Sequence, residues 1–163
     1  MKKFLFLLFA GILGFTACEG PMGPEGPPGR DAIKTEWWNF DCEIKPNMWT
    51  LIGNRNEIGS YYQCNFEVPE LTQDIYLDGA IIAYYRYLNE KEVEVQSPLP
   101  FTLYDILVQN GIEYPYAMQF SYEVMPTVGT SPGIITFKLT FSDFLTEIVP
   151  PVNPVLFRLT LIY

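Results

Sequence analysis

Alternation of large apolar residues with polar or small ones dominates the second half of the chain. From Tyr114 to Val124, a tyrosine, methionine, phenylalanine or valine occupies every second position. The runs 135–141 and 155–163 repeat this period of two. Because successive side chains of a β-strand point to opposite faces, each run predicts an antiparallel strand with one buried face.

Shorter runs of the same kind, separated by proline, glycine and asparagine, continue the pattern back to residue 36. These earlier predicted strands are 36–44, 48–52, 60–68, 75–87, 92–96 and 101–108. Only turn-length pieces, 69–74 and 142–146, interrupt the strands. Asn110-Gly111 predicts a type I′ hairpin between the strands on either side, because both residues tolerate a positive φ. About nine strands indicate an all-β fold, an antiparallel β-sandwich of immunoglobulin-like or Greek-key type.

The first residues of the chain have a different pattern. Lys2 and Lys3 precede an apolar run of roughly 12 residues, shorter than the ~20 that a membrane-spanning helix needs. This arrangement predicts a signal peptide, residues 1–17, that is cleaved on export. Phe15-Thr16-Ala17-Cys18 resembles the bacterial lipobox, which implies lipidation of Cys18 and a stable anchor of several acyl chains. The alternative is a secretory signal with a chance cysteine at its end.

Residues 18–31 hold four collagen-type triplets, running from Gly20 to Asp31. Glycine at every third position beside proline favours polyproline II, and twelve residues at ~3.1 Å each reach about 37 Å. We expect this segment to be a stiff spacer. The alternative is the nucleus of a triple helix that makes the protein a homotrimer, although so short a segment recovers little of its ordering entropy. The remaining residues, 32–163, are predicted to form one β-sandwich domain.

Composition removes several classes of function. The chain has no histidine, which excludes Ser-His-Asp and Cys-His catalysis and any histidine-ligated zinc or haem. Loss of residues 1–17 leaves 8 basic and 19 acidic residues, a net charge of −11. The basic residues are scattered singly, so we expect no nucleic acid as a partner. We also expect no metal and no cofactor, because the polar loop 53–57 lacks the acidic spacing of a calcium loop.

Two cysteines remain besides Cys18. Alternation places Cys42 and Cys64 on the inward faces of their predicted strands. In an exported protein they are a candidate disulfide, which would close a loop of roughly 22 residues and add about 3 kcal/mol in the chain-entropy model. The alternative is a pair of small buried thiols.

Carboxylates and aromatic residues are the other candidate functional groups. Glu90, Glu92 and Glu94, or Asp41 and Glu43, could in principle form the carboxylate pair of a glycosidase. Spacing by two on strands is explained equally well by a solvated face, so we do not expect an enzyme. Of the adjacent Trp37 and Trp38, one is predicted to face outward, and we take Trp37 as the candidate surface contact. Other aromatic residues that could contact a sugar or a protein, if exposed, are Trp49, Tyr61, Tyr84 and Tyr116.

The order of lipobox, collagen-like triplets and an aromatic-rich β domain, with segments such as 61–69 and 141–144, resembles uncharacterised collagen-like lipoproteins of Bacteroidetes. The resemblance implies a lipid-anchored protein of the bacterial cell envelope and brings no known activity or functional residue. We expect the outer membrane, with the domain facing the periplasm or the cell surface.

The sequence therefore predicts a non-enzymatic envelope lipoprotein, tethered to the membrane through Cys18, whose sandwich contacts an unidentified protein or glycan. The first alternative is a structural, trimeric collagen-like surface protein. The second is a carboxylate-dependent hydrolase, which would need two converging carboxylates in a cleft with perturbed pKa values.

Overall fold

The computed structural model describes residues 35–55, 57–142 and 151–163 of the chain. A compact unit spans Thr35–Tyr163. The predicted signal peptide, Cys18, the spacer 18–31 and the predicted domain start at residue 32 lie outside the described residues. In the part that the structure describes, no helix has both the length and the apolar character needed to cross a membrane.

Nine strands and two short helices make up the described part of the chain. The strands are β1 (Trp37–Ile44), β2 (Thr50–Ile52), β3 (Tyr61–Val68), β4 (Ala80–Leu88), β5 (Glu94–Pro98), β6 (Phe101–Gln109), β7 (Ile112–Met125), β8 (Gly133–Phe141) and β9 (Val155–Ile162). A 3-10 helix, η2 (Pro46–Met48), precedes β2, and an α-helix, α2 (Gln73–Asp78), precedes β4.

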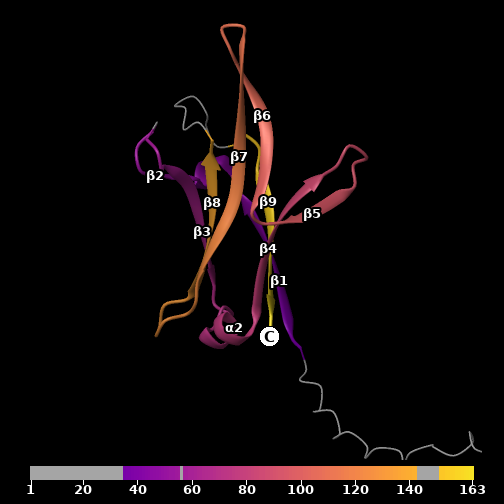
Figure 1. Cartoon of the computed structure of the whole chain (residues 1–163). Coiled ribbons are helices and arrows are strands. Elements are labelled where there is room, and N and C mark those ends of the chain that lie inside the picture. The colour runs from indigo at the N-terminus through magenta and orange to yellow at the C-terminus, as the bar shows by residue number, and fades with distance from the viewer. Residues whose placement is uncertain (1–34, 56, 143–150) are drawn as a thin grey trace, which may run out of the picture. The chain divides into compact units, whose positions relative to one another are not determined.

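The strands form two antiparallel sheets (Figure 1). One has the order β1-β9-β4-β5 and the other the order β2-β3-β8-β7-β6. In the second sheet β6, β7 and β8 follow one another as neighbours and β3 lies beside β8, which is the order of a Greek key. The predicted all-β sandwich is confirmed, and so is the pairing of the strands that flank Asn110-Gly111.

The core lies between the two sheets and is centred on aromatic rings. Phe137 of β8 and Phe157 of β9 stack across the sandwich with ring centroids 4.4 Å apart. Phe120 of β7 meets Phe157 edge-on at 5.4 Å. All three side chains are almost completely buried, and full burial of such a side chain stabilises a fold by about 1.5–3 kcal/mol. The alternation read from the sequence is therefore the inward face of each sheet.

The predicted strand 75–87 is wrong in its first part. Helix α2 occupies Gln73–Asp78, and β4 begins only at Ala80. The side chain of Thr72 caps the helix by accepting a hydrogen bond from the Ile75 N–H at 3.3 Å. Gly79 follows, where an added Cβ would overlap the carbonyl oxygen of Ile162. A cap and a close backbone approach thus override the strand-like spacing of the apolar side chains.

The predicted strand 92–96 is displaced by two residues, since β5 runs over Glu94–Pro98. A tight turn precedes it, in which the Asn89 side-chain oxygen accepts hydrogen bonds from the N–H groups of Lys91 and Val93. Glu92 adopts a φ of 57° in this turn. Asparagine side chains stabilise such turns by bonding to the backbone a few residues on.

Candidate functional site

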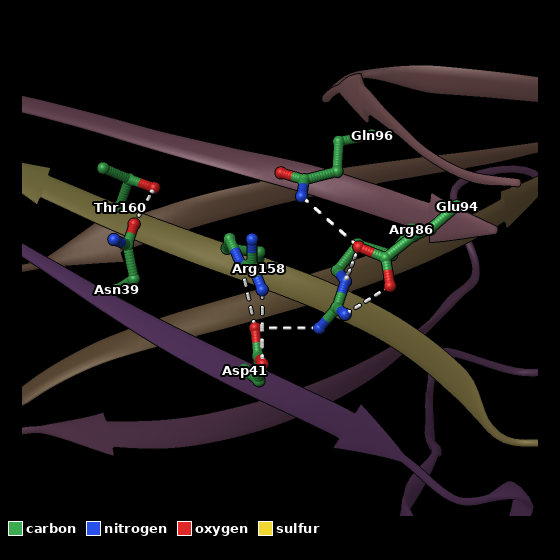
Figure 2. Close-up of polar contacts among 7 residues, drawn as sticks. All are labelled: Asn39, Asp41, Arg86, Glu94, Gln96, Arg158 and Thr160. Carbon is green, nitrogen blue, oxygen red and sulfur yellow. Dashed lines mark hydrogen bonds and ion pairs between the residues drawn. The ribbon is translucent and has the colours of Figure 1, made fainter.

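Charged residues form a row across the outer face of the four-stranded sheet, with one contribution from each strand (Figure 2). Arg158 of β9 donates from Nε to Asp41 Oδ1 of β1 at 2.9 Å. Arg86 of β4 lies 2.8 Å from the same carboxylate oxygen and 2.7 Å from Glu94 Oε2 of β5. Each carboxylate of the row therefore has an arginine partner.

This row bears on the predicted carboxylate chemistry. The hydrogen bond from Arg158 lowers the pKa of Asp41, and the hydrogen bond from Arg86 lowers the pKa of Glu94. A general acid needs the opposite shift, which keeps its proton near neutral pH. Within the described residues, no group of three or more acidic or cysteine side chains is placed to hold a metal ion. The row is suited to tying the four strands together.

The predicted row of Glu90, Glu92 and Glu94 on one strand face is wrong. Only Glu94 lies in a strand, whereas the other two lie in the turn between β4 and β5. Sequence spacing placed Glu94 correctly on a solvated face but did not identify its arginine partner, because Arg86 is eight residues away on the neighbouring strand.

Cys42 and Cys64 are both buried and lie on opposite sheets, in β1 and β3. Cys42 pairs in register with Phe157, and Cys64 pairs with Phe137, so the two thiols flank the stacked rings. Burial raises the pKa of Cys42 to about 11, with smaller contributions from Asp41 and Cys64. Both residues are free thiols in the structure, so the candidate disulfide is not formed there. Their inward orientation was predicted correctly.

Trp37 has an exposed fraction of 66%, as predicted, whereas Trp38 packs against the core. A role for Trp37 in contacting a partner stays a prediction. Trp49 is buried, and Tyr116 is half-buried against Phe141. The aromatic residues chosen from the sequence therefore do not gather into one surface.

The feature that stands out from the rest of the sandwich is the distal part of the β6–β7 hairpin, residues 104–117, which we call the arm. From Met118 onward β7 pairs with β8, whereas Ile112–Ala117 pairs with β6 alone. The two strands run on together beyond the end of β8 (Figure 1). Asn110 and Gly111 close the arm with φ angles of 50° and 77°. In the described residues no third strand supports it.

The arm has apolar side chains on its outer face, the face directed away from the other sheet. Alternation places Tyr104, Ile106 and Val108 there, and their exposed fractions are 84%, 53% and 62%. Their register partners on β7 are Ala117, Pro115 and Glu113. Single exposed apolar residues are ordinary, but a contiguous group on one face marks an interaction surface.

A shallow open hollow of about 480 Å3 lies on the arm beside the end of β8. Its lining includes Tyr104, Ile106, Pro115 and Ser142. The Ser142 Oγ accepts a hydrogen bond from the Ala117 N–H at 3.0 Å, which holds the base of the arm against the end of β8. The hollow offers an apolar site with few polar groups.

One backbone N–H on the free edge of β6 is covered by a carboxylate. Asp105 Oδ1 accepts a hydrogen bond from the Ile106 N–H at 2.8 Å, and Oδ2 accepts one from the Tyr116 hydroxyl at 3.2 Å. A charged side chain on an edge strand opposes the addition of another strand. Addition of another strand is therefore disfavoured at this point of the β6 edge.

Sequence reasoning placed a strand at 101–108 but did not single out Tyr104, Ile106 or Val108. The available signal was a run in which both alternating sets of side chains are largely apolar, FTLYDILV. Such a run is typical of a strand covered on both faces.

Comparisons with protein-family models, with curated proteins and with solved structures found no match to this chain.

Proposed function

We propose that the chain is a non-enzymatic lipoprotein of the bacterial cell envelope whose β-sandwich makes contact with another macromolecule. The anchor is a lipid on Cys18, and the Gly/Pro segment 18–31 holds the domain away from the membrane. The observation that carries the contact function is the exposed apolar face of the arm, because solvent exposure of three adjacent large apolar side chains is costly unless a partner covers them.

The charged row supports a non-enzymatic role for the opposite face of the sandwich. Asp41 and Glu94 are two carboxylates that both contact Arg86. The arginine hydrogen bonds lower the pKa of each carboxyl group. The hydrolase alternative gains no support from them. The trimer alternative rests on the four triplets of residues 20–31. Mass measurement of the delipidated protein in solution tests it, and a monomer at micromolar concentration would contradict the trimer.

Metabolic labelling with an alkynyl fatty acid tests the anchor. The wild-type chain is expected to take up the label and to sediment with membranes, and Cys18→Ala is expected to lose both properties. Cys64→Ala is the matched control and should keep the label, because its thiol is buried in the folded domain. Label retained by Cys18→Ala would overturn the proposed anchor.

Protease treatment of intact cells tests where the domain is displayed. Loss of the domain from intact, protease-treated cells would place it at the surface, and protection until the outer membrane is opened would place it in the periplasm. Recovery of the domain in the cytoplasmic fraction would contradict the envelope location.

A further inference from the structure

The outer face of the five-stranded sheet changes character along its length. Over β3 and β8 the outward positions are mostly polar, for example Gln63, Asn65 and Lys138. Lys138 is paired with Glu123 and lies 4.7 Å above the ring of Tyr61. Beyond β8, the same face carries Tyr104, Ile106 and Val108. Apolar side chains also occur outside the arm, as at Met125, but on the arm they occupy three successive outward positions of one strand.

The exposed side chains of the arm form a strip with a defined length. Outward residues on one strand repeat every ~6.6 Å, so the three side chains of β6 cover about 13–14 Å. Pro115 and Ala117 extend the strip sideways onto β7. Tyr104 is its largest member, and tyrosine is among the residues that contribute most to binding between proteins.

Charge distinguishes between the occupants that this strip could have. Residues 101–117 contain Asp105 and Glu113 and no lysine or arginine. Two copies of the arm docked face to face would bring only like charges together, which disfavours a second copy of this chain. A partner with lysine or arginine around an apolar centre would instead be attracted to the acidic rim.

In the described part of the domain, the lysine and arginine residues do not surround an apolar centre of this kind. Arg86, Arg158 and Lys138 are engaged in ion pairs on the two sheets. Lys45, Arg55 and Lys91 lie in separate connections, before η2, between β2 and β3, and between β4 and β5. The cations outside the ion pairs therefore lie singly, in three separate connections of the described chain, which disfavours docking of an arm from another copy.

We propose that the outer face of the arm binds a partner protein through an apolar patch bordered by lysine or arginine side chains. The apolar centre of that patch covers Tyr104 and Ile106, and its basic rim lies near Glu113, which pairs with Val108 on the same face. Contact is face to face, because the charged side chain of Asp105, bonded to the Ile106 N–H, opposes the addition of a strand at the edge of β6. The inference rests on the proposed function only in that the domain contacts a macromolecule, and it does not require the lipid on Cys18.

The test is a titration of the full chain with a synthetic cyclic hairpin peptide that carries isoleucine and tyrosine on one face and lysine around them. The chain is held in lipid nanodiscs, or in buffer if it carries no lipid, so failure of the anchor does not prevent the measurement. Amide chemical shifts of residues 104–117 are expected to change. Affinity is expected to fall at least threefold between 50 and 300 mM salt, because screening weakens the contribution of the charged rim.

Matched peptides and variants give the controls. A peptide with glutamate in place of lysine should bind at least tenfold more weakly. The double variant Tyr104→Ser, Ile106→Thr should lose at least tenfold in affinity for the lysine peptide, whereas Ile58→Thr, which changes a residue that is 95% exposed elsewhere, should lose none.

Three results would overturn the proposal. Equal binding of the lysine and glutamate peptides would show that the partner's patch needs no basic rim. Changes in the amide chemical shifts of the arm with maltoheptaose, and none with the lysine peptide, would show that the arm binds a glycan and not a protein. Concentration-dependent self-association that is lost in the double variant would show that the arm binds a second copy of this chain.

Discussion

The strands β6 and β7 form the arm and continue into the base of the five-stranded sheet, yet the apolar residues of the base and of the arm lie in different surroundings. At the base, the inward side chains Phe120 and Phe137 are covered by the other sheet, and the outward side chains are mostly polar. On the arm, Tyr104 and Ile106 point outward and are exposed. The comparison separates two uses of apolar residues, since those at the base hold the fold together and those on the arm are available to a partner.

The largest expected difference between the two regions is in stability. Phe157→Ala, which removes the ring stacked on Phe137, should lower the free energy of unfolding by about 3–5 kcal/mol. Tyr104→Ala should change it by less than about 0.5 kcal/mol, as for other exposed positions. Denaturant unfolding at neutral pH measures both. A loss above about 2 kcal/mol for Tyr104→Ala would mean that the arm belongs to the core.

The buried thiol of Cys42 predicts a pH dependence at the base. Its folded-state pKa is about 11 against a usual value of 9.0, so the folded protein keeps a proton that the unfolded chain loses as the pH rises. The stabilising contribution is complete below pH 9 and is lost as the pH rises through 11. At pH 10.5 the loss is about 2 kcal/mol.

Unfolding of wild type and Cys42→Ala at pH 8 and pH 10.5 measures this effect. The stability advantage of the wild type over the variant should shrink by about 2 kcal/mol at the higher pH. An unchanged advantage would show that the thiol does not titrate in this range, as expected if Cys42 were bonded in a disulfide.

A smaller effect is expected from opening the edge of the arm. Asp105→Ala removes the acceptor of the Ile106 N–H and the Tyr116 hydroxyl, and should cost about 1 kcal/mol. It should also promote association through the exposed edge of β6, seen by sedimentation. Glu113→Ala removes the same charge without either hydrogen bond and should stay as monomeric as the wild type. Association of both variants alike would assign the effect to charge alone.

The smallest effect is expected on the outer face of the four-stranded sheet. Arg158→Met removes one partner of Asp41 and should destabilise the fold by at most about 1 kcal/mol, because surface ion pairs contribute little. The difference from the wild type should shrink in 1 M NaCl. A loss of several kcal/mol that persists in high salt would show that the row is essential to the fold.

The fold could be predicted from the sequence where periodicity is strong. The alternation of Phe137 and Leu139, and the positive-φ tolerance of Asn110-Gly111, are local properties of strands and turns, and both predictions were confirmed. The helix at 73–78 was missed because it depends on the cap from Thr72 and on the approach of Gly79 to β9, a contact between residues far apart in the sequence.

The candidate site could not be predicted in the same way. Alternation assigns Tyr104 and Ile106 to one face of a strand, but it does not say where the neighbouring strand β8 ends. That end decides which part of the hairpin stands alone. The ion pairs of Arg86 depend similarly on which strands become neighbours, so only the charges and not their partners can be predicted from the chain.

Photo-cross-linking in intact cells tests the central claim most directly, with a photoreactive amino acid placed either at Tyr104 on the arm or at Thr136 on the base of the same outer face. The account predicts one discrete protein adduct from position 104, whose cross-linked segment has lysine or arginine beside apolar residues, and no adduct from position 136. Identical adducts from both positions, or none from position 104, would contradict it.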